Sequence, residues 1–209
     1  MAELTINMGG YQPPTSVHNR AAEVFGKELK TRLDDRVEFN LDGNMPGSTG
    51  CRADDLPKMV DKGDLTMCYF ASSYLTENVP EMGIFDLPFV VDSREKAYAA
   101  LDGELGDLLK KKYLETTGWR VLGFWDNGFR HFTNSKRAMR TPSDCEGMSV
   151  RSMNSELHQE FFRLLGMDPM YVDVSDLVEA AKTGKLDAQE NPLTNTYRFG
   201  THKYHRHIT

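Results

Sequence analysis

Segments that favour β-strands alternate with segments that favour helices along most of the chain, and this order strongly limits the available folds. The pattern opens with an alternating strand at Glu3–Met8, a helix capped by Ser16 with its apolar stripe at Val17, Ala21, Phe25 and Leu29, and a strand over 36–42. Such alternation is typical of α/β layers with mostly parallel sheets. We therefore predict an α/β fold with helices on both faces of mixed, mostly parallel sheets.

The other elements are predicted from local signals of the same kind. The break at 45–50 precedes a short helix near 53–62 that ends at Gly63, and then a strand over 64–71. A long helix over 93–117 is acidic early and basic late, as the helix dipole favours. Strands are expected at 119–125, 128–134, 148–153, 169–174 and 185–189, and helices at 154–166 and 175–184. Asn191 and Pro192 form a favourable start for a last helix.

The length and composition indicate a globular protein with its own core. The 209 residues suit one large domain or two lobes, and a weak boundary near 124–128 predicts lobes of 1–124 and 125–209. The net charge is -6, and the basic residues form short, separate clusters, so we do not expect nucleic-acid binding. The first ten residues show no signal peptide, so the protein is either cytosolic or has lost a presequence. The three cysteines are far apart and allow at most one disulfide.

Arg151 is the first candidate for a binding residue. It lies near the carboxyl end of the strand predicted over 148–153, and ligands of open α/β sheets bind beyond such strand ends. A guanidinium there offers a rigid fork that matches a carboxylate. The alternative is an arginine paired with a structural Asp or Glu, and the sequence leaves both possibilities open.

Three further residues have both a functional and a structural interpretation. Arg130 shares a strand face with Phe132 and is by itself more typical of a surface arginine. Trp125 could stack on a ligand or fill a core, which is the commoner fate of a tryptophan. Asn191 is interpreted as a helix N-cap, although a helix start also offers free N–H groups to an anion.

Motifs for catalysis, cofactors and metals are missing from the sequence. It has no GxGxxG, GxxxxGK[ST] or GxSxG pattern. Glu190 is discounted as a general base because no nucleophile lies at a recognisable spacing from it. His202 and His205 are three apart on a predicted helix, and a solvated helix face explains them better than a metal site. We therefore expect no cofactor, no metal and no catalytic residues.

Several stretches in order resemble the extracytoplasmic solute-binding proteins of TRAP transporters, the DctP-type substrate-binding subunits. They are "NGFRHFTNSKR", "TPSDCEGMSVR", "LLGMDP" and "AAKTGKLDAQENPL", supported by "HNRAAEVFGKEL" and "FDLPFVVDSREKAY". The resemblance implies a two-lobed fold like that of periplasmic binding proteins, which closes around a small organic acid. It also implies that Arg151 forks the ligand carboxylate, that Arg130 and Asn191 assist, and that Tyr69 reads the distal ligand groups.

The same resemblance implies a periplasmic monomer without a cofactor, which delivers its ligand to the membrane subunits of a TRAP transporter. The chain is shorter than is usual for the family, which implies that the C-terminal part of the usual fold is absent. It carries Ala188 where the family usually has Gly, and Val174 where an aromatic pocket wall is common. Together with Tyr69 and Trp125, Val174 favours a hydroxylated ligand such as a sugar acid.

Two other functions stay open at this point. One is a cytosolic α/β enzyme that acts on an acidic metabolite, with Glu190 or His131 as base. The other is a ligand-sensing input domain.

Overall fold

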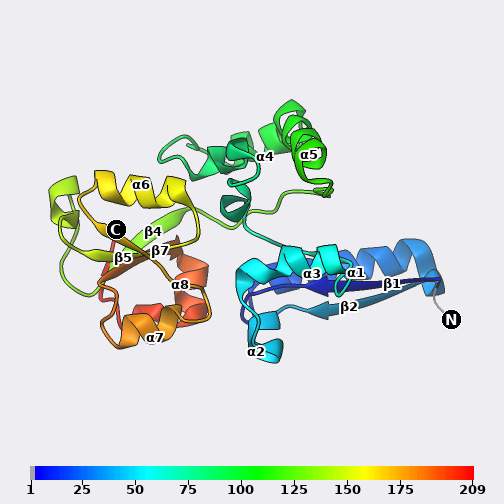
Figure 1. Cartoon of the computed structure of the whole chain (residues 1–209), viewed down its shortest axis with the longest axis horizontal. Coiled ribbons are helices and arrows are strands. Elements are labelled where there is room, and N and C mark those ends of the chain that lie inside the picture. The colour runs from blue at the N-terminus through cyan, green and yellow to red at the C-terminus, as the bar shows by residue number, and fades with distance from the viewer. Residues whose placement is uncertain (1–2) are drawn as a thin grey trace.

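The computed structural model describes residues 3–209 and shows two sheets, each in its own half of the molecule (Figure 1). The N-terminal lobe holds the first sheet, whose strand order is β2-β1-β3 with both pairs parallel. Its strands are β1 (Leu4–Gly9), β2 (Val37–Asp42) and β3 (Met67–Cys68). Its helices are α1 (Val17–Leu33), α2 (Met45–Thr49) and α3 (Leu56–Lys62).

Helix α1 begins as predicted, because the Ser16 hydroxyl accepts a hydrogen bond from the Asn19 backbone N–H at 3.1 Å. The predicted apolar stripe is only half-buried, and the buried residues of the helix are Asn19, Ala22 and Gly26. Gly26 allows close packing, since a Cβ there would overlap the ring of Phe39 on β2. The helix therefore contacts the sheet through small residues, with Phe25 packed edge-on against Phe39.

The C-terminal lobe holds the second sheet, with strand order β6-β5-β7-β4-β8. Strands β5, β6 and β7 run parallel, whereas β4 is antiparallel to both β7 and β8. One face is covered by a core around Phe162 and the other by a core around Leu177. The strands are β4 (Arg130–Asn134), β5 (Ser149–Ser152), β6 (Asp168–Tyr171), β7 (Ala188–Pro192) and β8 (His207–Ile208). The helices are α6 (Glu156–Leu164), α7 (Leu177–Lys182) and α8 (Leu193–Phe199).

A small helical unit lies apart from both sheets (Figure 1). The single helix predicted over 93–117 is wrong, because the structure divides it into α4 (Arg94–Leu101) and α5 (Glu104–Thr117) at Asp102-Gly103. The strand predicted over 119–125 is also wrong. Trp119, Val121 and Phe124 of this segment instead pack against the core around Leu109 and Tyr113.

Four other local predictions need correction. The break at 45–50 contains helix α2, and the third strand is only two residues long. The cap predicted at Asn191 is wrong, because β7 continues through Pro192 and α8 begins at Leu193 without a side-chain cap. His205 is buried and contacts the Thr133 hydroxyl, so it does not belong to a solvated helix face.

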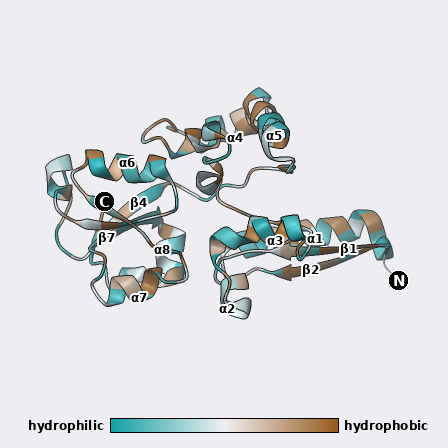
Figure 2. Cartoon of the chain, in the orientation of Figure 1, coloured by the Kyte–Doolittle hydropathy of each residue, from teal (hydrophilic) through white to brown (hydrophobic). Residues whose placement is uncertain are grey.

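All strands of the first sheet precede residue 69, and all strands of the second follow residue 129. This division fits two α/β lobes, while the boundary placed at 124/125 stays a prediction. Strands β1 and β2 of the first sheet are mainly hydrophobic (Figure 2), whereas β4 (RHFTN) and β7 (AQENP) of the second sheet carry mostly polar residues. None of the helices among residues 3–209 combines the length and apolar character needed to cross a bilayer.

Candidate functional site

Arg151 lies at the carboxyl end of β5, between β6 and β7, and its side chain is buried with 2% of its surface exposed. Its Nε donates a hydrogen bond to the Val172 carbonyl at 2.9 Å, which fixes the guanidinium at this sheet edge. No carboxylate of residues 3–209 forms an ion pair with it. A buried guanidinium without a carboxylate has unsatisfied charge, and an anionic ligand would supply the missing partner.

Arg130 differs from Arg151, because its charge already has a partner. Its Nε and Nη2 both donate to the Glu190 carboxylate, the latter at 2.7 Å, and Nη2 also donates to the Glu190 carbonyl at 2.9 Å. The register explains the pairing: Phe132 lies opposite Glu190 across β4 and β7, and Arg130 is two residues from Phe132 on the same face. Arg130 is therefore a half-buried arginine paired with an acid, which differs from the surface arginine that the sequence alone favours.

The Glu190 carboxylate is buried and strongly held in its ionised form. Burial would raise its pKa, but the charges and hydrogen bonds of Arg130 and His158 outweigh burial and lower the pKa to about 2. A general base works best with a pKa near the operating pH, so Glu190 is poorly suited to that role.

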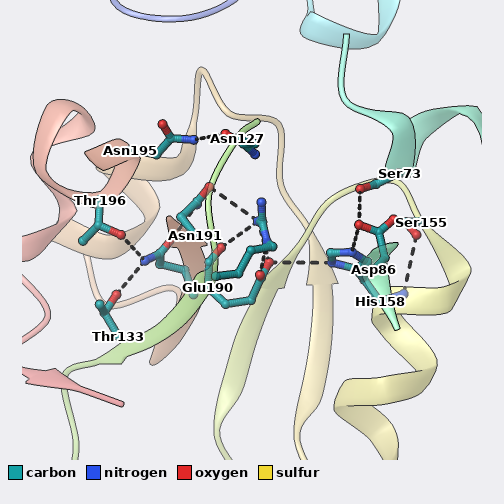
Figure 3. A network of polar contacts seen from close by, with 12 residues as sticks. Ser73, Asp86, Asn127, Thr133, Ser155, His158, Glu190, Asn191, Asn195 and Thr196 are labelled. Atoms are coloured by element: carbon teal, nitrogen blue, oxygen red, sulfur yellow. Dashed lines mark hydrogen bonds and ion pairs between the residues drawn. The ribbon is translucent and has the colours of Figure 1, made fainter. Parts of the chain in front are cut away.

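The amide groups on β7 continue the network on the other side of Arg130 (Figure 3). The Asn191 side-chain oxygen accepts from Arg130 Nη2 at 3.4 Å, and its Nδ2 donates to Gln189 Oε1 at 2.6 Å. Gln189 in turn donates to the hydroxyls of Thr133 at 2.6 Å and Thr196 at 3.3 Å. Asn191 is thus oriented by hydrogen bonds at both of its polar atoms, and it lies beside Arg130.

His158 on α6 was not predicted as part of the site. Its Nδ1 lies 3.7 Å from Glu190 Oε1, and its Nε2 lies 3.4 Å from Asp86 Oδ1 in the segment before α4. Asp86 Oδ1 also accepts from the Ser73 hydroxyl at 2.9 Å. Figure 3 shows the imidazole between the two carboxylates. A lone histidine in the first turn of an amphipathic helix offers no sequence signal for this role.

Tyr69 lies at the edge of the N-terminal lobe with its hydroxyl already hydrogen-bonded. The hydroxyl lies 2.9 Å from Asn19 Oδ1 and 3.1 Å from the Gly43 carbonyl, and it accepts from the Gln12 N–H at 3.1 Å. A phenolic hydroxyl has one donor and limited acceptor capacity, so these partners occupy it. Tyr69 as a reader of the ligand stays a prediction, and the residue is buried in the lobe with 8% of its surface exposed.

Trp125 joins an aromatic group at the same edge and is 44% exposed, so it does not fill a core. Its ring centroid lies 6.0 Å from that of Tyr69, which also contacts the rings of Tyr11 at 5.6 Å and His18 at 5.8 Å. The described residues thus place Tyr69 and Trp125 together and Arg130 and Asn191 together, while the hydrogen bond of Arg151 goes to Val172. Contact of any of them with a ligand stays a prediction.

The two lobes also touch directly beside this region. The Ala53 N–H donates to the buried Asp173 carboxylate at 3.3 Å, and the Tyr171 hydroxyl donates to Asp54 at 2.9 Å. Arg52 lies 3.6 Å from Asp176 in an exposed ion pair. These contacts join residues 52–54, at a 3-10 turn of the N-terminal lobe, to the end of β6 and the start of α7. They therefore hold the facing ends of the two lobes together.

Within residues 3–209 no group of three or more His, Cys, Asp or Glu side chains could hold a metal ion. Taken together, the fold and the site define a two-lobed α/β protein. At a sheet edge that faces the other lobe it carries a buried arginine, Arg151, and a second arginine, Arg130, that is paired with Glu190. These features are the ones expected of a protein that binds a small anion between its lobes.

The sequence matches the family described as bacterial extracellular solute-binding protein, family 7, over residues 8–209, so the chain belongs to that family. The family and the relatives named below are solute-binding proteins, not enzymes. Family members bind small organic acids and work with TRAP transporters, and the family is extracytoplasmic. The two-lobed α/β fold predicted from the sequence is confirmed by the match to solved TRAP solute-binding proteins.

Individual relatives have several different ligands. The 2,3-diketo-L-gulonate-binding periplasmic protein YiaO of Escherichia coli is 30% identical over 193 residues, which cover 92% of this chain and 58% of YiaO. A TRAP solute-binding protein of Sulfurospirillum deleyianum with bound succinate is 30% identical, with a TM-score of 0.91 over 100% of this chain and 66% of the other. A sugar-acid-binding protein of Advenella mimigardefordensis in complex with galactonate is 26% identical, with a TM-score of 0.90 over 98% and 64%. The chain thus spans well under two thirds of YiaO.

Proposed function

We propose that this protein binds a small organic acid between its lobes and delivers it to a TRAP-type membrane transporter. The observation that carries the proposal is the buried Arg151, held by the Val172 carbonyl and paired with no carboxylate of residues 3–209. Its guanidinium would bind the ligand carboxylate with two hydrogen bonds, each worth about 1.5–3 kcal/mol. Asn191 would add a hydrogen bond, and Arg130, already neutralised by Glu190, would contribute orientation more than net charge.

The ligand proposed is a hydroxylated acid, such as a sugar acid. The N-terminal lobe offers aromatic rings and neutral polar groups at the site edge, at Tyr11, His18, Tyr69 and Trp125. Hydroxyl-bearing ligands bind well to such surfaces, whereas a second carboxylate would call for a second unpaired cation. The galactonate and diketo-gulonate binders among the relatives are consistent with this choice.

Binding would favour the closed arrangement because the ligand contacts both lobes. We place the protein in the periplasm as a monomer, with the membrane subunits of the transporter as its partner, in keeping with the family. The low pKa of Glu190 argues against the rival function, an enzyme with this residue as base.

A thermal-shift screen of the purified chain against monocarboxylates, dicarboxylates, sugar acids and aromatic acids tests the proposal. We expect an increase in melting temperature with at least one hydroxylated acid, and NMR of the same mixture should show the acid unchanged. Conversion of an acid into a product would instead support an enzyme, and no shift with any acid would contradict binding.

A further inference from the structure

The buried polar network holds a histidine in the first turn of α6 whose ring lies between two carboxylates. His158 is 6% exposed, and the groups that face it come from three other segments. Asp86 approaches from the segment before α4, Glu190 from β7 and Arg130 from β4 behind Glu190. On its own helix the nearest ring is Phe162, which packs edge-on at 6.1 Å.

The charges in this network balance only when the imidazole is protonated. Two carboxylates, Asp86 and Glu190, face the guanidinium of Arg130 and the ring of His158. With a neutral imidazole one buried negative charge has no counterpart, and such a charge is costly. Asp86 Oδ2 has no hydrogen-bond donor among residues 3–209, so a nearby positive charge is the compensation available to it.

We propose that His158 is a positioning residue of the acid-binding site: as an imidazolium it links Glu190 to Asp86, and its protonation strengthens acid binding. This inference rests on the proposed function. The imidazolium holds the Glu190 carboxylate from one side while Arg130 holds it from the other, so the direction of the Arg130 fork depends on both. Through its contact with Asp86, the imidazolium also connects the lobe that carries Arg151 to the segment before α4 and to Ser73.

The link to ligand binding is electrostatic. An anionic ligand beside Arg130 and Arg151 stabilises a proton on the nearby imidazole, and by reciprocity the proton favours the ligand. The direction of the pKa of His158 agrees: burial would lower it, but the carboxylates of Asp86 and Glu190, 3.4 Å and 3.7 Å away, outweigh burial and raise it above the ordinary 6.5. Because the pKa is already above 6.5 in the ligand-free protein and a bound anion raises it further, the effect is full below pH 6.5 and is lost as the pH rises through the raised pKa.

Two measurements test the proposal, and the first needs no ligand. NMR titration of the ligand-free protein should show His158 protonated at pH 6.5 and above, and Asp86→Asn should move its titration to lower pH. A His158 ring that is already neutral at pH 6.5 would overturn the proposal. Since Asp86 does not contact Arg130, this variant leaves the arginine pairing in place.

The second measurement is the pH profile of affinity, by calorimetric titration of galactonate, with succinate as a second probe. We expect the affinity of the wild type to fall about tenfold between pH 6 and pH 8.5, the effect of one unit of coupled pKa change. His158→Gln should flatten this profile, whereas the control His202→Gln, on the 3-10 turn after α8, should keep it. Parallel profiles for the wild type and His158→Gln would overturn the inference. A wild type that binds no acid at any pH contradicts the proposed function, and the NMR titration still decides the charge on His158.

Discussion

Glu190→Gln is the substitution whose effect on stability can be worked out most fully from the structure. The change keeps the size of the side chain but removes the charge that Arg130 and His158 compensate. Lowering a pKa from its ordinary 4.5 to about 2 corresponds to about 3 kcal/mol in favour of the ionised carboxyl in the folded protein. Two charged hydrogen bonds at about 1.5–3 kcal/mol each give the same order. We therefore expect Glu190→Gln to lower the free energy of unfolding by about 3 kcal/mol at pH 7.

The pH dependence provides the sharper test. Because the pKa is depressed in the folded state, the stabilisation is present above pH 4.5 and is lost as the pH falls from there towards 2. Urea denaturation should show the difference between wild type and Glu190→Gln shrinking to about 1 kcal/mol at pH 3. The control Glu156→Gln, in an exposed pair with Arg163, should cost less than about 1 kcal/mol at any pH. A Glu190→Gln difference that is the same at pH 7 and pH 3 would refute the reasoning.

Two further predictions concern the contact between the lobes. Tyr171→Phe removes the hydrogen bond to Asp54 between the lobes. Because about 1 kcal/mol of closed-state contact is lost, calorimetry should show about fivefold weaker ligand binding. Unchanged affinity would show that this contact does not contribute to closure. In a Trp119→Phe background, the fluorescence of Trp125 should change on ligand addition because its ring lies against Tyr69 at the site edge, and a constant spectrum with proven binding would remove Trp125 from the site.

The order of the strands and helices was predictable because it depends on local patterns. The Ser16 cap and the strands carrying Arg130 and Arg151 lie where alternation and capping rules place them. The prediction of one long helix was wrong because the chain breaks at Gly103, before α5 begins. The prediction of a strand over 119–125 was wrong because Trp119, Val121 and Phe124 pack against the core that includes α5 instead of pairing in a sheet. Local propensity says nothing about either choice.

The candidate site was only partly predictable. Arg151, Arg130 and Asn191 carried a sequence signal through strand ends and family-like motifs. The pairing of Arg130 with Glu190, however, depends on the register of β4 and β7, and the contact of Arg151 with Val172 depends on the pairing of β5 with β6. His158 and Asp86 are brought together from α6 and the segment before α4 by tertiary packing alone. Sequence spacing gave no reason to pair them.

The most direct test of the central claim is a calorimetric titration of the best acid from the screen into wild type, Arg151→Ala and Arg140→Ala. Arg140 is an exposed arginine of the same lobe and serves as the control. Loss of two charged hydrogen bonds, about 3 kcal/mol or more, predicts at least a hundredfold weaker binding for Arg151→Ala. Arg140→Ala should bind like the wild type. Equal affinity of a folded Arg151→Ala and the wild type would contradict the account.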